Sequence, residues 1–188
     1  MDFKELLVKR RSIRDFEERP VSMELVKEML KETTLAPTAS NAQPCEFIII
    51  TDRALIKRLS DESKANLLKD FAASPNDRLR MYVDMLKNES FNVFYNAPCL
   101  VLVLGESSIA TLDFDAALTV AYLMFAATTR GLGTCWINLG ANIRDESLRR
   151  ELGVPDGHRI VAPIIIGYPK AIPEASARHE ARVLKIVS

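Results

Sequence analysis

Short apolar segments alternate along the chain with longer segments in which apolar residues recur every three or four positions, so the pattern predicts both strands and helices. The short segments are rich in β-branched residues and bounded by turn residues, as strands usually are. The predicted strands are residues 47–51, 99–104 and 160–166, and residues 134–137 are expected to be extended. Because strands and helices do not alternate regularly, the order of elements predicts an α+β fold around a small sheet.

Six segments show the apolar periodicity of helices. They are residues 2–10, 22–34, 53–60, 78–94, 113–130 and 145–152. In the first segment we expect Phe3, Leu6 and Leu7 to face inward, and in the second Ser22 is the expected N-cap. Residues 61–77 fit neither period, and their last four residues are expected to be a loop.

The segment 113–130 is apolar on nearly every side. A helix with this pattern must be enclosed by protein, either as the central helix of a monomer or with cover from a second subunit. In a chain of 188 residues we favour the second alternative, which predicts a homodimer.

The composition indicates one globular domain spanning residues 1–188, because 48% of the residues are hydrophobic and can fill a core. The 25 basic residues balance 25 acidic ones, which argues against nucleic acid or a membrane surface as a partner. The three cysteines form no CxxC pair, so no disulfide scaffold or zinc ribbon is expected. The longest apolar run, residues 116–128, is too short to span a bilayer, and the first residues do not resemble a signal peptide. A cytoplasmic protein is expected.

Several kinds of catalytic machinery are absent from the sequence. The only GxG, Gly131-Leu132-Gly133, lacks the third glycine of a dinucleotide-binding loop, and there is neither a Walker A loop nor a GxSxG elbow. The two histidines, His158 and His179, have no neighbours at metal-ligand spacing. We therefore expect no metal site and no catalytic side chain, so that in an enzyme a bound cofactor would carry the chemistry.

A basic motif follows the first predicted helix. In extended chain, alternate side chains point to the same side, so Arg10, Ser12 and Arg14 would converge on one ligand. Two guanidinium groups and a hydroxyl suit a phosphate. The alternative is a solvated basic turn that stabilises the carboxyl end of the helix.

Two further segments carry weaker signals. Residues 36–44 contain two prolines around small and polar residues, so their backbone could approach a flat ring closely; an ordinary helix-to-strand connection is the alternative. Residues 131–140 contain a helix stop followed by a buried strand, in which core packing is the default role of Trp136.

Taken in order, these segments resemble the nitroreductase family of FMN-dependent oxidoreductases, from Phe3 to about Val187. Residues 10–14 are similar to its RxSxR phosphate segment, residues 36–44 to its Pro-Ser-x-x-Asn-x-Gln-Pro-Trp loop, and residues 131–136 to its Gly-Leu-Gly-x-x-Trp stretch. The resemblance implies a nitroreductase-like α+β fold with a mixed or antiparallel sheet flanked by helices. It also implies an intertwined homodimer with flavin sites at the interface.

The resemblance implies a position for the FMN phosphate. Arg10 and Ser12 would bind it together with Arg11. Arg178 would be a second basic ligand from the C-terminal region, and Arg182 is the alternative for that position.

The resemblance also implies which residues surround the flavin ring. Arg14 would lie near its pyrimidine end. The partner subunit would contribute Pro37, Thr38, Ala39 and Asn41. The backbone beside the ring, with a donor to flavin N5, would come from Ile137, Asn138 and Leu139. The chain departs from the family pattern at Cys45, where the loop usually ends in tryptophan.

The activity implied is a ping-pong reaction, in which NADH or NADPH delivers a hydride to FMN N5 and a nitroaromatic, quinone or similar conjugated acceptor then replaces it. One alternative is another flavin reaction on the same fold, such as dehalogenation or dehydrogenation. A second is a flavin-binding redox sensor or carrier without turnover, and a third is a helical dimerisation module without a cofactor.

Overall fold

An antiparallel sheet of four strands forms the centre of the computed structural model, which describes residues 1–75 and 77–187. The strands lie in the order β1-β2-β4-β3 across the sheet. They are β1 (Glu46–Ile50), β2 (Cys99–Glu106), β3 (Gly133–Trp136) and β4 (His158–Gly167). The predicted α+β architecture is confirmed, and each pair of neighbouring strands is antiparallel.

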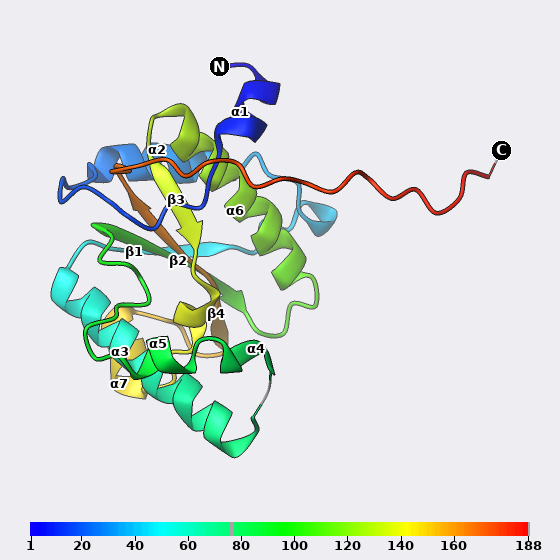
Figure 1. Ribbon diagram of the computed structural model, residues 1–188. Helices are drawn as coiled ribbons and strands as arrows, with labels where there is room; N and C mark the ends of the chain where they lie inside the picture. Colours follow the sequence, from blue (N-terminus) through cyan, green and yellow to red (C-terminus); the bar gives the residue numbers. More distant parts are fainter. Residues whose placement is uncertain (76, 188) are drawn as a thin grey trace.

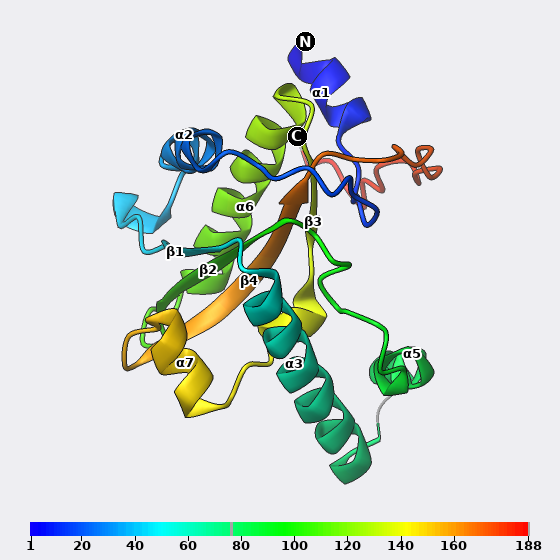
Figure 2. The same cartoon turned by 90° about the vertical axis from the view of Figure 1, so that its left-hand side faces the viewer.

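Helices cover both faces of this sheet (Figures 1 and 2). One face is covered by α2 (Met23–Thr33) and α6 (Leu112–Thr129), and the other by α3 (Arg53–Ala73) and α7 (Glu146–Leu152). Smaller elements are α1 (Phe3–Lys9) against α6, α4 (Asp77–Arg80) and α5 (Val83–Lys87) against α3, and the 3-10 turns η1 (Ala39–Asn41) and η2 (Asn138–Ala141).

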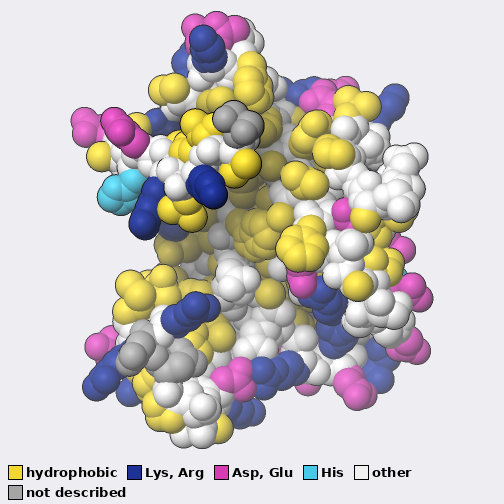
Figure 3. Space-filling model, turned by 90° about the vertical axis from the view of Figure 1, so that its right-hand side faces the viewer, with side chains coloured by type: hydrophobic (Ala, Val, Ile, Leu, Met, Phe, Trp, Pro, Cys, Tyr) yellow, Lys and Arg dark blue, Asp and Glu magenta, His cyan; other side chains and the backbone are white. Residues whose placement is uncertain are grey.

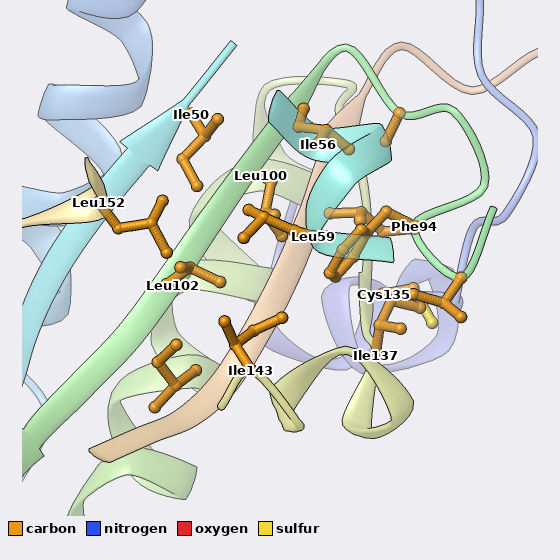
Figure 4. Close-up of a cluster of buried hydrophobic side chains, with 14 of the residues drawn as sticks. Ile50, Ile56, Leu59, Phe94, Leu100, Leu102, Cys135, Ile137, Ile143 and Leu152 are labelled. Carbon is orange, nitrogen blue, oxygen red and sulfur yellow. The ribbon is translucent and has the colours of Figure 1, made fainter. Parts of the chain in front are cut away.

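The strand β2 divides the core into two clusters. Because successive side chains of a strand point to opposite faces, Leu100 and Leu102 join the cluster beneath α3, whereas Val101 and Val103 join the cluster beneath α6. Figure 4 shows the cluster on the α3 side. Burial on both faces explains why β2 is apolar without alternation.

Two helix predictions are wrong. The helix expected at 53–60 continues to Ala73. Its polar residues interrupt the apolar period, yet several are buried because they bind backbone groups of neighbouring loops. The single helix expected at 78–94 is instead α4 and α5, followed by turns. A loop was expected at residues 74–77. Ser74 and Pro75 are indeed not helical, but Asp77 is the first residue of α4. Asn76 lies outside the described residues.

The inward orientation expected for α1 is wrong within a single chain. No side chain of α1 is buried, and Phe3 and Leu7 are 66% and 49% exposed. The helix projects beyond the end of the sheet, and among the described helices it packs mainly against α6 (Figure 1). Phe3 touches the Phe125 ring of α6 and Leu6 is half-buried, but most of the apolar side of α1 has no cover within the protomer.

The helix α6 is buried on one side only. Leu112, Ala116 and Leu123 pack in the core, whereas Phe114 and Leu118 are exposed. Among the described helices, α6 alone is long and apolar enough to cross a membrane, with a mean hydropathy of 1.2 and 44% of its residues buried. Its packing against the sheet and α2 is that of a core helix with one uncovered side.

The chain beyond β4 forms an extended tail. Residues 171–187 contain no helix or strand, and the end of this tail projects away from the body of the molecule (Figure 1). Their side chains are exposed, including those of Val183, Leu184 and Ile186.

Candidate functional site

The basic motif runs beside the edge strand of the sheet. Ser12 forms a parallel bridge with Thr134 of β3, and the backbone N–H of Ile13 donates to the carbonyl of Thr134 over 3.0 Å. Ile13 is buried, which leaves its neighbours on the outer side, as the alternation of extended chain predicts. Because the two segments run in parallel, Arg14 lies toward the end of β3 and the turn η2.

The tail completes a basic hollow next to this motif. The hollow measures about 410 Å³ and is lined by Leu7, Val8, Arg10, Arg11, Ser12, Arg14, Pro173, Glu174, Ala175, Ser176 and Arg178. Its charged lining residues are thus four arginines and one carboxylate, that of Glu174. Among the described residues, the guanidinium groups of Arg10, Arg14 and Arg178 form no ion pair. The structure therefore brings the predicted phosphate residues together with Arg178, whereas Arg182 does not line the hollow.

The surrounding face of the molecule is concave. Figure 3 shows a hollow below the tail, with hydrophobic side chains on its floor and Lys and Arg side chains along its rim. A flat aromatic group with a charged end would match this combination of apolar floor and basic rim.

Sequence reasoning missed Tyr95 as a neighbour of Arg14. The guanidinium carbon of Arg14 lies 5.9 Å from the centre of the Tyr95 ring, a cation–π contact. Tyr95 and Asn96 both have positive φ values, 53° and 52°, which are uncommon for residues other than glycine. The buried Asn92 holds them, because its amide donates to Asn96 and its carbonyl oxygen accepts from the Phe94 N–H. The sequence signal nearest to this feature is Asn96-Ala97-Pro98 before β2.

Cys135 is buried close to the basic motif. Burial raises the pKa of its thiol. The positive charge of Arg14, a hydrogen bond with Ser12 and the positive charge of Arg10 each lower this pKa by less. The thiol is therefore neutral near pH 7, and the positive charge of the hollow is not cancelled by a thiolate.

The turn after β3 is fixed on two sides. Ser63 of α3 donates to the Leu139 carbonyl over 2.6 Å, and a Cβ at Gly140 would clash with the Phe94 ring. The N–H of Ile137 donates to the Pro163 carbonyl over 2.8 Å. Of the three residues predicted to face the flavin N5, Ile137 therefore already uses its N–H within the protomer.

The small-residue loop lies elsewhere. Pro37, Thr38, Ala39 and Asn41 surround η1, which is on a different side of the protomer from the basic motif in both ribbon views (Figures 1 and 2). Positive φ values at Ser40, Asn41 and Gln43 give the loop a tightly turned backbone. A single chain therefore does not bring all the predicted residues to one site.

Cys45 lines a second, smaller hollow beside this loop. It measures about 110 Å³ and is lined by Thr33, Thr34, Ala36, Thr38, Gln43, Cys45, Phe47 and Thr119. Burial raises the pKa of the Cys45 thiol, a hydrogen bond with Thr119 lowers it, and the charge of Asp115 raises it. Cys45 is thus a neutral, half-buried side chain near pH 7.

Comparison with known proteins finds chains of similar sequence and a similar fold. A protein of Archaeoglobus fulgidus, provisionally named NADH dehydrogenase/NAD(P)H nitroreductase, is 27% identical over 88% of this chain and 84% of its own length. The iodotyrosine deiodinase of Thermotoga neapolitana is 28% identical over 88% of this chain and 87% of its own length. A crystal structure of a Bacteroides fragilis nitroreductase with bound FMN superposes with a TM-score of 0.83 and 23% identity, covering all of both chains.

The architecture of this chain is therefore the nitroreductase fold. The sequence model described as "Nitroreductase family" matches residues 7–168, which include the basic motif, the small-residue loop and the turn after β3. The chain belongs to the nitroreductase family.

Proposed function

We propose that this protein is an FMN-dependent oxidoreductase that transfers a hydride from NADH or NADPH to a nitroaromatic, a quinone or a similar conjugated acceptor. Donor and acceptor bind in turn at the same flavin face, so the kinetics are ping-pong. The single observation that carries the proposal is the hollow in which Arg10, Arg11, Arg14 and Arg178 gather around Ser12. The FMN found in the Bacteroides fragilis structure and the name of the Archaeoglobus fulgidus relative support it.

The chemistry of the hollow fits the phosphate of FMN. Guanidinium groups bind phosphate oxygens through paired, charge-assisted hydrogen bonds, and those of Arg10 and Arg178 have no carboxylate partner among the described residues. The hydroxyl of Ser12 adds a neutral donor between them. A small anion could satisfy these groups equally well, so the apolar floor and the position of Arg14 distinguish FMN from inorganic phosphate.

When bound, FMN supplies the hydride chemistry, because its N5 accepts and returns a hydride without help from a protein acid or base. Arg14 places positive charge at the end of the site nearer to η2, where it would favour the reduced, more negative cofactor. The backbone N–H groups of Asn138 and Leu139 would orient the ring at N5. No titratable side chain has to move a proton to the ring.

We also propose that the active protein is a cytoplasmic homodimer. Three apolar surfaces lack cover in the protomer: one side of α1, one side of α6 and the tail. Exposed apolar surface of this extent favours association. In the dimer, the loop with Pro37, Thr38, Ala39 and Asn41 would reach the flavin held by the partner subunit, which explains why one chain leaves it apart from the basic hollow.

The visible spectrum of the purified protein tests this function. A flavin spectrum that bleaches under nitrogen on addition of NADH or NADPH, and returns on addition of menadione or nitrofurazone, is expected. A colourless protein that binds no added FMN would overturn the proposal. A flavoprotein that neither nucleotide reduces would instead be a redox sensor or carrier.

Replacing Arg10 tests the phosphate site. Arg10→Ala removes one charge-assisted donor pair, so the Kd for FMN should rise by roughly 10- to 100-fold. Titration of the apoprotein with FMN, followed by quenching of flavin fluorescence, measures this change. Arg58→Ala is the matched control, since Arg58 pairs with Glu151 on the surface and does not line the hollow. Equal FMN affinity in both variants would contradict the assignment.

Reductive dehalogenation is the second candidate, because the Thermotoga neapolitana deiodinase is similar along nearly its whole length. It uses the same proposed cofactor site and differs in the acceptor. Release of iodide from an iodinated phenol, at a rate above that of quinone reduction, would favour this reaction over the leading one.

A further inference from the structure

Asp115 is a buried carboxylate in the first turn of α6, and it connects this helix to the small-residue loop. Only 3% of its surface is exposed. Its Oδ1 accepts a hydrogen bond from the backbone N–H of Ala39 over 2.9 Å, and its Oδ2 accepts from the hydroxyl of Thr111 over 2.8 Å. Each oxygen therefore has one donor, and the bond to Ala39 spans 76 positions of the sequence.

Burying a carboxylate is costly unless its charge is compensated. Among the described residues Asp115 forms no ion pair, so its compensation comes from the two hydrogen bonds and from the positive end of the α6 dipole. An apolar side chain would fill this position more cheaply if core packing were its only task. The Ala39 N–H is the group that requires an acceptor at this point.

The loop that Asp115 holds has a conformation that needs support. Ser40, Asn41 and Gln43 adopt φ values of 50°, 55° and 48°, a region that residues other than glycine rarely occupy without support. Within the loop, the Gln43 N–H donates to the Thr38 hydroxyl over 3.0 Å. The bond from Ala39 to Asp115 attaches this turned backbone to the rigid helix that faces the sheet.

We propose that Asp115 is a positioning residue for FMN: by fixing Ala39, it holds the loop of residues 37–43 in the shape that contacts the flavin. This role rests on the proposed function, and it places an anionic side chain of α6 behind the loop as part of the cofactor site. Asp115 acts through the loop and needs no contact with the cofactor.

Asp115→Ala is the direct test. Loss of the bond to Ala39 should weaken FMN binding to the reconstituted dimer by about tenfold, the size expected for one hydrogen bond to a charged group. The circular dichroism of the bound flavin in the visible range should change as well, because the loop would no longer press on the ring in one conformation. A purely structural role would lower the unfolding temperature without altering this signal.

Asp113→Ala is the matched control. Asp113 lies two residues earlier in the same helical turn, but it is exposed and pairs with Arg159 over 2.7 Å. It shares the helix dipole and the charge of Asp115 without touching the loop. Asp115→Asn should restore FMN binding, since its amide oxygen can accept from Ala39 and its NH₂ group can donate to the Thr111 hydroxyl.

A second variant approaches the same bond from the loop. Ala39→Pro removes the N–H at the first position of η1, where proline is tolerated, and the preceding Thr38 is already extended, as a residue before proline must be. It should weaken FMN binding like Asp115→Ala, and the double variant should be no weaker than either. This variant keeps the proposal testable if Asp115→Ala does not fold.

The outcomes are separable. If the unmodified apoprotein binds no FMN, the proposed function fails. If it binds FMN, but Asp115→Ala or Ala39→Pro binds within twofold of it with an unchanged flavin signal, the positioning role is overturned. Equal losses of FMN affinity in Asp113→Ala and Asp115→Ala would also overturn the positioning role. The loss would then come from removing negative charge at the start of α6, whatever its contact with the loop.

Discussion

At the scale of single residues, burial decides the chemistry of the thiols. Cys99 begins β2 with no exposed surface, and burial raises the pKa of its thiol to about 12. Cys45 and Cys135 are shifted in the same direction for the same reason. All three side chains are therefore poor nucleophiles in the folded protein.

This shift predicts a loss of stability in alkali. Cys99 titrates near its ordinary pKa of about 9.0 in the unfolded chain and at about 12 in the folded one, so between these values only the folded state keeps the proton. The stability contributed below pH 9 is lost as the pH rises toward 12, with a slope of about 1.4 kcal/mol per pH unit.

Urea denaturation at about pH 8 and about pH 10.5 measures the effect. The difference in unfolding free energy between the unmodified protein and Cys99→Ala should shrink by about 1–2 kcal/mol between the two conditions. A constant difference would show that Cys99 titrates alike in both states.

The grouping of Arg10, Ser12 and Arg14 in one hollow could be predicted from the sequence, whereas the contacts of Tyr95 and Asp115 could not. Arg10, Ser12 and Arg14 share a side because alternation is a local property of extended chain. The hydrogen bond between Asp115 and Ala39 spans 76 positions, and only the folded chain brings the two together. Tyr95 contacts Arg14 because the turn at Tyr95 and Asn96 has positive φ values. The turn contains no glycine, so the sequence does not indicate these φ values.

At the scale of elements, α3 shows why buried polar residues make a helix hard to predict from its apolar periodicity. Its side toward the site carries Ser60, Ser63, Lys64 and Asn66, each at most 7% exposed. They bind backbone groups of the loop before β2 and of the chain around η2. A prediction from apolar spacing assigns polar residues to the solvent side of a helix. Because these polar residues interrupt the apolar spacing, the predicted helix ended at residue 60. The strands were predictable, because their burial is expressed in apolar residues alone.

Lys64 tests the importance of this polar side. Its ammonium group donates to the carbonyls of Asn88 and Phe91 over 2.9 Å and 2.8 Å. Lys64→Met keeps the length of the side chain but leaves both carbonyls without this donor, so the free energy of unfolding should fall by about 2–3 kcal/mol.

Lys57→Met is the control on the same helix. Lys57 is about half exposed and pairs with Asp61, so its loss should cost about 0.5 kcal/mol or less. Urea denaturation of both variants gives the comparison. Similar costs for the two lysines would contradict a supporting role for Lys64.

At the scale of the whole molecule, the uncovered side of α6 predicts the assembly state. Phe114, Leu118 and Tyr122 are four residues apart, lie on one side of the helix, and are 72%, 43% and 37% exposed. Leu118→Glu would bury a charge in the proposed dimer interface but leave it in solvent in a monomer. The dimer Kd should therefore rise by roughly 30-fold or more.

Sedimentation velocity over a range of concentrations measures this change. Met81→Glu is the control, because Met81 is 75% exposed in the turn between α4 and α5 and does not belong to α6. An unmodified protein that sediments as a monomer would contradict the proposed assembly. A Leu118→Glu dimer of unchanged affinity would place the interface elsewhere.

The basic hollow has one wall from residues 7–14 and the other from residues 173–178. A ribosome produces the first wall long before the second, so a nascent chain lacks a complete hollow until Arg178 has emerged. The full set of four arginines is therefore assembled only after most of the chain has been synthesised, so a nascent chain that lacks Arg178 should hold an anion more weakly than the folded protein.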